Sequence, residues 1–135
     1  NDDNEDVAPL DELPIPDVPE NAPIFDQWEK AASRLLMNLS RQPQAHIFAE
    51  PVDWEKLEIP DYPQIIKRPM DFATIKTKLK EHKYRGVREY MDDMELVFAN
   101  CATYNAVGTD VAQLGIAVHE EYQRLVQQLY LNFYL

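Results

Sequence analysis

Cysteine and glycine are scarce in this 135-residue sequence, which has one cysteine, Cys101, and three glycines. A single thiol excludes an intrachain disulfide framework, and with it the small secreted scaffolds that depend on one. Few glycines suit long helices better than a meander of strands. No apolar run approaches the ~20 residues of a membrane-spanning helix. Because the N-terminus is acidic, where a secretion signal would be basic and then apolar, we expect no targeting by that route.

Side chains for metal or covalent chemistry are also sparse. The three histidines stand far apart and show no zinc-ligand spacing. The His119-Glu120 pair lacks the second histidine of a metalloprotease helix. Asp92-Asp93 is interpreted as a solvated helix face rather than a catalytic carboxylate pair, because no nucleophile or base motif lies nearby. We therefore expect no metal site, no cofactor and no enzymatic activity.

Positive charge is in short supply as well. The chain carries 24 acidic and 13 basic residues, a net charge of -11. Residues 1–20 hold eight acids and no base, a net of -8, whereas residues 21–135 hold 16 acids and 13 bases, a net of -3. Because binding to a phosphate backbone needs clustered cations, this balance argues against a dedicated nucleic-acid binder.

Proline divides the chain into two parts. Five of the ten prolines fall in residues 9–23, and none follows Pro69. We interpret residues 1–23 as an acidic, proline-rich arm with polyproline II character, and residues 24–135 as the folded domain. Four apolar side chains exceed what a purely solvating tail needs. We expect them to pin the arm, in an extended form, against the folded domain or a neighbouring molecule: Leu10, Leu13, Ile15 and Val18.

Four stretches show the apolar period of a helix. They are residues 24–42, residues 72–79 with Asp71 as N-cap, residues 87–104, and a last stretch from Thr109 or Asp110 to near the C-terminus. Each stripe needs partners to bury against, so the pattern predicts an all-α four-helix bundle. The stripes are Phe25, Trp28, Ala32, Leu35 and Leu39; Phe72, Ile75 and Leu79; Val87, Tyr90, Met91, Met94, Val97, Phe98, Cys101 and Tyr104; and Val111, Leu114, Val118, Leu125 and Leu129.

The connection between the first two predicted helices is unusually long. It spans about 27 residues, 43–69, where links in bundles usually run ~2–8 residues. It also carries nine large apolar residues, so it must fold onto something. It could simply cover the core, or it could form the wall of a pocket at one end of the bundle.

Motifs in this linker and in the third predicted helix resemble those of the bromodomain family. The linker motifs are Pro51-Val52-Asp53, Leu57-Glu58-Ile59-Pro60-Asp61-Tyr62 and Ile65-Ile66-Lys67-Arg68-Pro69-Met70-Asp71. They are followed by Thr74-Ile75-Lys76 with Leu79, and by Phe98-Ala99-Asn100-Cys101-Ala102-Thr103-Tyr104-Asn105. The resemblance covers residues 24–131 in order and with few gaps, so it is far more specific than any single motif.

The resemblance implies a left-handed antiparallel four-helix bundle that binds acetyl-lysine at one end, between the long linker and the turn after the third helix. By this match Asn105 donates its side-chain amide to the acetyl carbonyl, and Tyr62 reaches the same oxygen through a water. Val111 takes the gatekeeper position, and Phe48 lies at the pocket floor. The other matched wall positions are Val52, Leu57, Ile59 and Tyr104.

The sequence departs from the family pattern at three places. His46-Ile47-Phe48 stands where the family often has Trp-Pro-Phe, which replaces a flat apolar shelf beside the pocket mouth with a smaller, titratable ring. Pro63 follows Tyr62 and removes a backbone donor. Val111 as a small gatekeeper predicts a more open entrance than an aromatic residue would leave.

Several of these residues also have a purely structural interpretation. Asn105 could serve only as a C-terminal helix cap. Tyr62 and Phe48 could be ordinary core aromatics, and Cys101 on an apolar stripe is typical of buried packing. The sequence alone is compatible with both the structural and the functional interpretation of these residues.

The chemistry of acetyl-lysine fits the pattern independently of the family. An acetylated lysine is an apolar stem that ends in a neutral amide, so an apolar slot with one donor would bind it. The same slot would reject a charged ammonium, because burying that group without a partner is costly. Together with the resemblance to bromodomains, which implies the partner and the setting, this chemistry leads us to expect a non-catalytic, monomeric, nuclear module of a larger protein that binds acetylated histone tails. The alternative is a helical bundle that binds basic partners by charge alone.

One segment opposes the acidic average. Six of the 13 basic residues lie between positions 76 and 88, and Lys76, Lys80 and Lys83 are expected to share one helical face. Such a cluster is usually a solvated surface. The functional alternative is weak contact with DNA phosphates.

Overall fold

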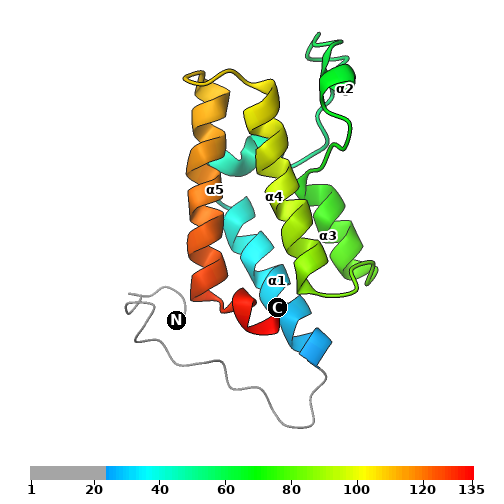
Figure 1. Ribbon diagram of the computed structural model, residues 1–135, viewed down its shortest axis with the longest axis vertical. Coiled ribbons are helices and arrows are strands. Elements are labelled where there is room, and N and C mark those ends of the chain that lie inside the picture. The colour runs from blue at the N-terminus through cyan, green and yellow to red at the C-terminus, as the bar shows by residue number, and fades with distance from the viewer. Residues whose placement is uncertain (1–23) are drawn as a thin grey trace.

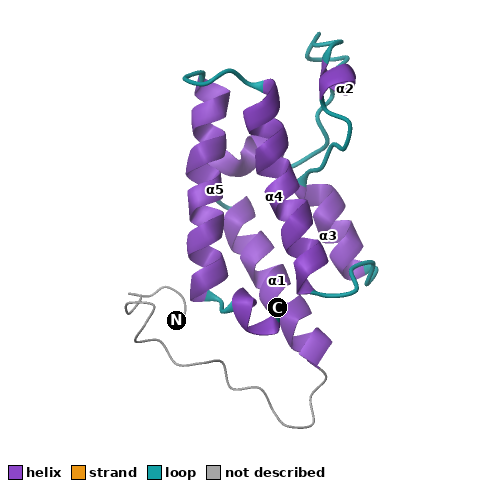
Figure 2. Cartoon of the chain, in the orientation of Figure 1, coloured by secondary structure: helices purple, strands orange, loops and turns teal. Residues whose placement is uncertain are grey.

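The computed structural model describes residues 24–135, so the expectations for the acidic arm and its four apolar residues fall outside the described residues. Four long helices make up most of this part: α1 (Ile24–Ser40), α3 (Phe72–Lys80), α4 (Val87–Tyr104) and α5 (Asp110–Gln128). Residues 24–135 contain no strand (Figure 2). The all-α prediction is confirmed. None of the described helices is long and apolar enough to cross a membrane.

The four long helices form an antiparallel bundle. In Figure 1, α1 and α4 run toward the end of the molecule that carries the short helix α2 (Tyr62–Ile65), while α3 and α5 run away from it. The turn between α4 and α5 lies at the same end as α2, and the short C-terminal 3₁₀ helix η3 (Leu131–Tyr134) lies at the opposite end. The linker and the α4–α5 turn therefore meet at one end of the bundle.

Helices α3 and α5 begin at residues whose side chains cap them. The Asp71 carboxylate accepts hydrogen bonds from the Thr74 backbone N–H at 3.0 Å and from the Thr74 hydroxyl at 2.6 Å. The Ala112 N–H donates to the Thr109 hydroxyl oxygen at 3.3 Å at the start of α5. The contacts from the Thr74 and Ala112 N–H groups each satisfy a backbone donor that the first helical turn leaves unpaired. The predicted N-cap at Asp71 and the predicted start of the last helix are confirmed.

The predicted apolar stripes supply most of the core. Among them, Leu35, Ile75, Tyr90 and Met94 are almost fully buried, and Tyr122, which the predicted stripes omit, is buried as well. The buried Tyr90 hydroxyl donates to the Ala32 backbone oxygen at 2.9 Å and so joins α4 to α1. Val111 departs from the prediction: it opens the stripe on α5 but is 40% exposed, because it lies at the open end of the bundle.

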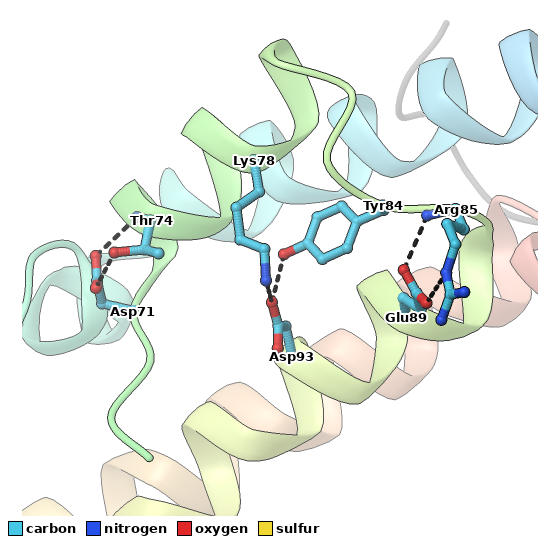
Figure 3. A network of polar contacts seen from close by, with 7 residues as sticks. All are labelled: Asp71, Thr74, Lys78, Tyr84, Arg85, Glu89 and Asp93. Carbon is cyan, nitrogen blue, oxygen red and sulfur yellow. Dashed lines mark hydrogen bonds and ion pairs between the residues drawn. The ribbon is translucent and has the colours of Figure 1, made fainter.

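A polar network ties α3 to α4 inside this apolar setting. The buried Asp93 carboxylate accepts a hydrogen bond from the Tyr84 hydroxyl and an ion-paired hydrogen bond from the Lys78 ammonium, both at 2.7 Å and both at the same oxygen. Figure 3 shows the Lys78 and Tyr84 side chains converging on Asp93. The Lys78 nitrogen also lies 4.7 Å from the centre of the Tyr84 ring. The three groups satisfy one another. The prediction of a solvated helix face at Asp92-Asp93 therefore holds for the exposed Asp92 but is wrong for Asp93, which is 7% exposed because its carboxylate faces Lys78 and Tyr84.

The prediction that Lys83 shares a helical face with Lys76 and Lys80 is wrong. Helix α3 ends at Lys80, and His82 takes a left-handed backbone conformation with φ 55°, which turns the chain out of the helix. The Lys83 ammonium lies 3.9 Å from the Glu81 carboxylate. The first helix also ends earlier than predicted, at Ser40 rather than at residue 42. The next element, the 3₁₀ helix η2, begins at Pro43.

The linker of residues 43–69 contains two short helices, the 3₁₀ helix η2 (Pro43–Phe48) and α2. Pro63 occupies the first turn of α2, where the missing N–H would have had no helical partner. Ala45, Phe48, Tyr62 and Ile66 are buried, whereas Leu57 is 61% exposed. The linker thus folds onto the bundle at both ends and leaves part of its apolar surface open between them.

Candidate functional site

A cavity of about 290 Å³ lies between the linker and the C-terminal half of α4. All eight site residues predicted from the sequence line it: Phe48, Val52, Leu57, Ile59, Tyr62, Tyr104, Asn105 and Val111. The structure therefore brings together residues that are up to 63 positions apart in the chain. Most of the lining is apolar or aromatic, as a slot for a neutral apolar ligand requires.

Aromatic rings close the inner end of the cavity. The Phe48 ring packs against Phe72 and Phe98, with ring centres 5.9 Å and 5.7 Å apart. Behind it lies Gly115 of α5: a Cβ atom there would come within 2.7 Å of the Cys101 sulfur and 3.7 Å of the Phe48 ring. The absence of a side chain at Gly115 is what lets α5 approach the cavity floor this closely.

Asn105 follows the last residue of α4 and is held by the end of that helix. Its backbone N–H and its side-chain Nδ2 both donate to the Cys101 carbonyl oxygen, each at 3.0 Å. Asn105 therefore does cap the C-terminus of α4. The hydrogen bond from Nδ2 to the Cys101 oxygen also fixes the direction of the carboxamide. Nδ2 carries a second N–H, for which residues 24–135 offer only the Cys101 sulfur, at 3.7 Å. Because a thiol is a weak acceptor, a ligand carbonyl can replace it at small cost.

Cys101 contributes an uncharged wall. Burial raises the pKa of its thiol, while the hydrogen bond from Asn105 acts in the opposite direction. The net effect keeps the thiol protonated at neutral pH. A neutral sulfur beside Asn105 preserves the apolar character of the cavity.

Two tyrosines form the wall on the linker side. Burial, and secondarily Cys101, raise the pKa of Tyr62, so its phenol stays a hydrogen-bond donor at neutral pH. The Tyr62 ring meets the Tyr104 ring edge-on, with centres 4.9 Å apart. The Tyr104 hydroxyl donates to the Asp61 carboxylate at 2.7 Å, and this bond raises the pKa of Tyr104. The Tyr104 side chain thus lines the cavity, while its hydroxyl is hydrogen-bonded to the linker residue Asp61.

The entrance is apolar and open. Val52 and Ile59 are half-buried, whereas Leu57 and Val111 present exposed side chains at the rim. His46, expected beside the mouth, does not line the cavity: its ring is exposed and its Nδ1 lies 2.8 Å from the Pro43 oxygen. Ile47 lines the cavity in that part of η2.

Sequence reasoning missed seven lining residues: Ile47, Glu50, Met70, Asp71, Val97, Asn100 and Cys101. Helical spacing could have found some of them. Val97 and Cys101 stand eight and four residues before Asn105, on the same face of α4. Asn100 stands four residues before Tyr104, and its side-chain amide donates to the Arg68 oxygen at 2.8 Å. The residues contributed by the linker carry no comparable periodic signal.

Comparison with known proteins agrees with this geometry. The family model described as Bromodomain matches residues 32–117. The chain is 40% identical over 101 residues to the SWR1 complex bromodomain subunit bdf1 of Schizosaccharomyces pombe, which covers 75% of this chain and 18% of that protein. It is 46% identical over 71 residues to the human bromodomain and PHD finger-containing protein 3, covering 53% of this chain and 6% of that protein.

A third relative is the Arabidopsis thaliana transcription factor GTE3, chloroplastic, which is 42% identical over 82 residues, or 61% of this chain and 18% of that protein. The chain thus spans less than a fifth of the length of each of these relatives. The matched region contains both walls of the cavity and the asparagine at the end of α4. On the family match and these identities, the chain belongs to the bromodomain family.

Proposed function

We propose that this domain binds acetylated lysine in histone tails without catalysing a reaction, and so recruits its host protein to chromatin in the nucleus. The observation that carries the proposal is the Asn105 carboxamide, fixed by its bond to Cys101 and lining a cavity that is otherwise mainly apolar. An acetyl carbonyl would accept from the second N–H of Asn105, while the lysine stem contacts Val52, Ile59 and Val111. In this scheme Tyr62 supplies its phenol to the same oxygen through a water.

The cavity favours the acetylated over the charged form of lysine. An ammonium taken from water into this site would lose hydration without gaining an anionic partner at Asn105. A matched amide contributes about 1 kcal/mol net, but an unmatched buried partner costs ~1–3 kcal/mol. Discrimination against unmodified lysine is therefore expected to exceed the affinity gained from the amide bond itself.

The surface around the linker suits a basic tail. Its acidic residues Glu50, Asp53, Glu55, Glu58 and Asp61 are all exposed, and Glu50 also lines the cavity. Charges at a rim raise the association rate more than the final affinity. We expect binding of one acetylated peptide to weaken with added salt, mainly through slower association.

The affinity of a single site is expected to be modest. The acetylated side chain offers about eight non-hydrogen atoms, and ~0.5–0.75 kcal/mol for each gives about -4 to -6 kcal/mol. This range corresponds to a Kd between about 1 mM and tens of micromolar. A domain of this kind would act as one of several contacts made by a larger protein. Two of the relatives are named as a subunit of the SWR1 complex and as a transcription factor, which fits that setting.

Isothermal titration with one histone peptide in acetylated and unmodified forms tests the proposal. We expect heat only with the acetylated peptide, and its loss in Asn105→Ala. Asn132→Ala, an exposed asparagine on η3 at the other end of the bundle, is the matched control and should bind as the wild type does. Thermal unfolding of each variant shows whether it is folded. Equal binding of both peptides would instead favour a bundle that recognises basic partners by charge.

A second substitution separates loss of the donor from loss of fold. Asn105→Asp keeps the size of the side chain but replaces the amide donor with a carboxylate. We expect it to lose the acetylated peptide and to gain affinity for the unmodified, positively charged one. Unchanged binding of the acetylated peptide by Asn105→Asp would contradict the assigned role of Asn105.

A further inference from the structure

A long groove runs between α1 and α3, on a different part of the molecule from the cavity. Two adjoining hollows of about 530 Å³ and 330 Å³ make it up, and they share Ser33, Met37, Leu79 and Lys80. None of the groove residues lines the cavity beside Asn105. The groove is therefore a separate surface that peptide binding at the cavity leaves open.

The groove is strongly basic. Its cationic residues are Lys30, Arg34, Arg41, Lys76 and Lys80. The single acid among its lining residues, Glu29, lies 3.1 Å from the His82 ring nitrogen. Within residues 27–135, ion pairs engage Lys78, Lys83 and Arg85 but neither Lys76 nor Lys80. The groove thus concentrates positive charge on a domain whose net charge is negative.

The groove also contains apolar side chains among its cations, namely Leu36, Met37 and Leu79. Met37 is 55% exposed and lies where the two hollows meet, with the Leu79 side chain beneath both. The Met37 sulfur accepts a hydrogen bond from the Arg41 guanidinium at 3.3 Å, which places an apolar side chain directly beside a cation. A matching partner would carry carboxylates and apolar side chains in alternation. A nucleic-acid backbone would use the cations but leave Met37 without a contact.

We propose that the acidic arm, residues 1–23 of this same chain, binds in the α1–α3 groove. The arm carries eight acids and no base in residues 1–20, and it interleaves them with Leu10, Leu13, Ile15 and Val18. It is joined directly to α1, which forms one side of the groove. Both the sign of the charge and the apolar residues of the arm match the groove.

The length of the arm allows this contact. Met37 stands 13 residues after Ile24, or about 20 Å along the helix at ~1.5 Å per residue. An extended chain covers that distance in about six or seven residues at ~3.3 Å each. A short tether also gives the arm an effective concentration in the millimolar range, so contacts that are individually weak suffice. Binding of the arm would shield this basic face from anionic partners.

Amide NMR on the full chain tests the proposal. In the variant Lys76→Glu/Lys80→Glu we expect the amide signals of residues 7–18 to move to random-coil positions, although the substitutions lie about 60 residues away. Lys83→Glu/Arg88→Glu makes the same change in charge outside the groove and should leave those signals in place. In the reverse direction, replacing Asp11, Glu12 and Asp17 by their amides should shift the signals of residues 33–41 and 76–80.

Three results would overturn the proposal. The first is random-coil signals for residues 7–18 in the wild-type chain, or signals that the groove variant leaves unchanged. The second is groove shifts that disappear on dilution, which would mean that the arm of a second copy binds there. The third is duplex DNA that shifts the groove signals at physiological salt while the arm signals stay in place, which would make the groove a nucleic-acid site.

Discussion

The Tyr104 hydroxyl donates to the Asp61 carboxylate at 2.7 Å across 43 residues of sequence, and this bond ties the start of α2 to the last residue of α4. One turn earlier on α4, the Asn100 amide donates to the Arg68 oxygen at 2.8 Å on the other side of α2. The two contacts flank the segment that carries Tyr62. The linker wall of the cavity is thus fastened to α4 on both sides of Tyr62.

Tyr104→Phe is expected to weaken binding of an acetylated histone peptide several-fold while the domain stays folded. The variant keeps the ring that meets Tyr62 but removes the donor to Asp61, so the linker gains freedom that the ligand must then restrict. Titration calorimetry gives the affinity. Amide hydrogen exchange should show faster exchange confined to residues 53–66.

Asp61→Asn is the matched control for Tyr104→Phe. Its side-chain oxygen still accepts a hydrogen bond from Tyr104, so we expect the linker amides to exchange about as slowly as in the wild type. The peptide should associate somewhat more slowly, because one negative charge at the rim is lost. Wild-type affinity in Tyr104→Phe would show that the bond to Asp61 does not position the cavity wall.

Gly115 and Cys101 are expected to be energetically coupled. In Gly115→Ala the new Cβ would stand 2.7 Å from the Cys101 sulfur, so we expect a net loss of about 1 kcal/mol: overpacking costs ~1–3 kcal/mol, and replacing glycine inside a helix returns ~0.5–1 kcal/mol. In a Cys101→Ala background the clash is gone, and Gly115→Ala should stabilise instead. Urea unfolding of the four proteins measures the coupling. Equal effects of Gly115→Ala in both backgrounds would rule out the contact.

Asp93 is expected to matter for stability far more than its neighbour Asp92. Asp93→Ala removes the acceptor of both Lys78 and the buried Tyr84 hydroxyl, and we expect a loss of about 2–4 kcal/mol, because a buried donor is left without a partner. Lys78 is partly exposed and can turn to water, which keeps the value below that of a fully buried pair. Asp92→Ala, on the exposed face, should change stability by less than ~0.5 kcal/mol. Similar effects for both variants in chemical unfolding would contradict this assignment.

Much of the site could be predicted because motifs that resemble the bromodomain family supplied Val52, Leu57, Ile59, Tyr62, Tyr104 and Asn105. Helical spacing alone gave the end of the third helix at Tyr104, without a role for the residues around it. The four helices followed from apolar periods that have to be buried, and the structure buries most of these side chains, with Val111 as an exposed exception. Asp71 was recognisable as a cap because its side chain acts on its own helix, three residues away.

The features that could not be predicted depend on contacts far apart in sequence or on rare backbone geometry. Nothing in the sequence pairs Asp61 with Tyr104, or Lys78 and Tyr84 with Asp93. Nothing marks His82 for a left-handed conformation either, although that conformation removes Lys83 from the face of α3. Gly115 has the appearance of an ordinary helix residue until the position of Cys101 on the facing helix is known.

Tyr84 is expected to make the domain sensitive to alkaline pH. Burial, followed by its hydrogen bond to Asp93, raises the pKa of Tyr84 well above the value of about 10 of an unfolded chain. A raised folded-state pKa means that the stabilisation is complete below pH ~10. Above that pH the unfolded chain releases the phenol proton while the folded chain retains it, so the free energy of unfolding falls by up to ~1.4 kcal/mol per pH unit for this group. Tyr84→Phe lacks this proton and should lose less stability between pH 9 and pH 11. Chemical unfolding of both proteins at these two pH values measures the difference. If the substitution costs the same at pH 9 and pH 11, the Tyr84 phenol titrates alike in both states and its bond to Asp93 does not protect it.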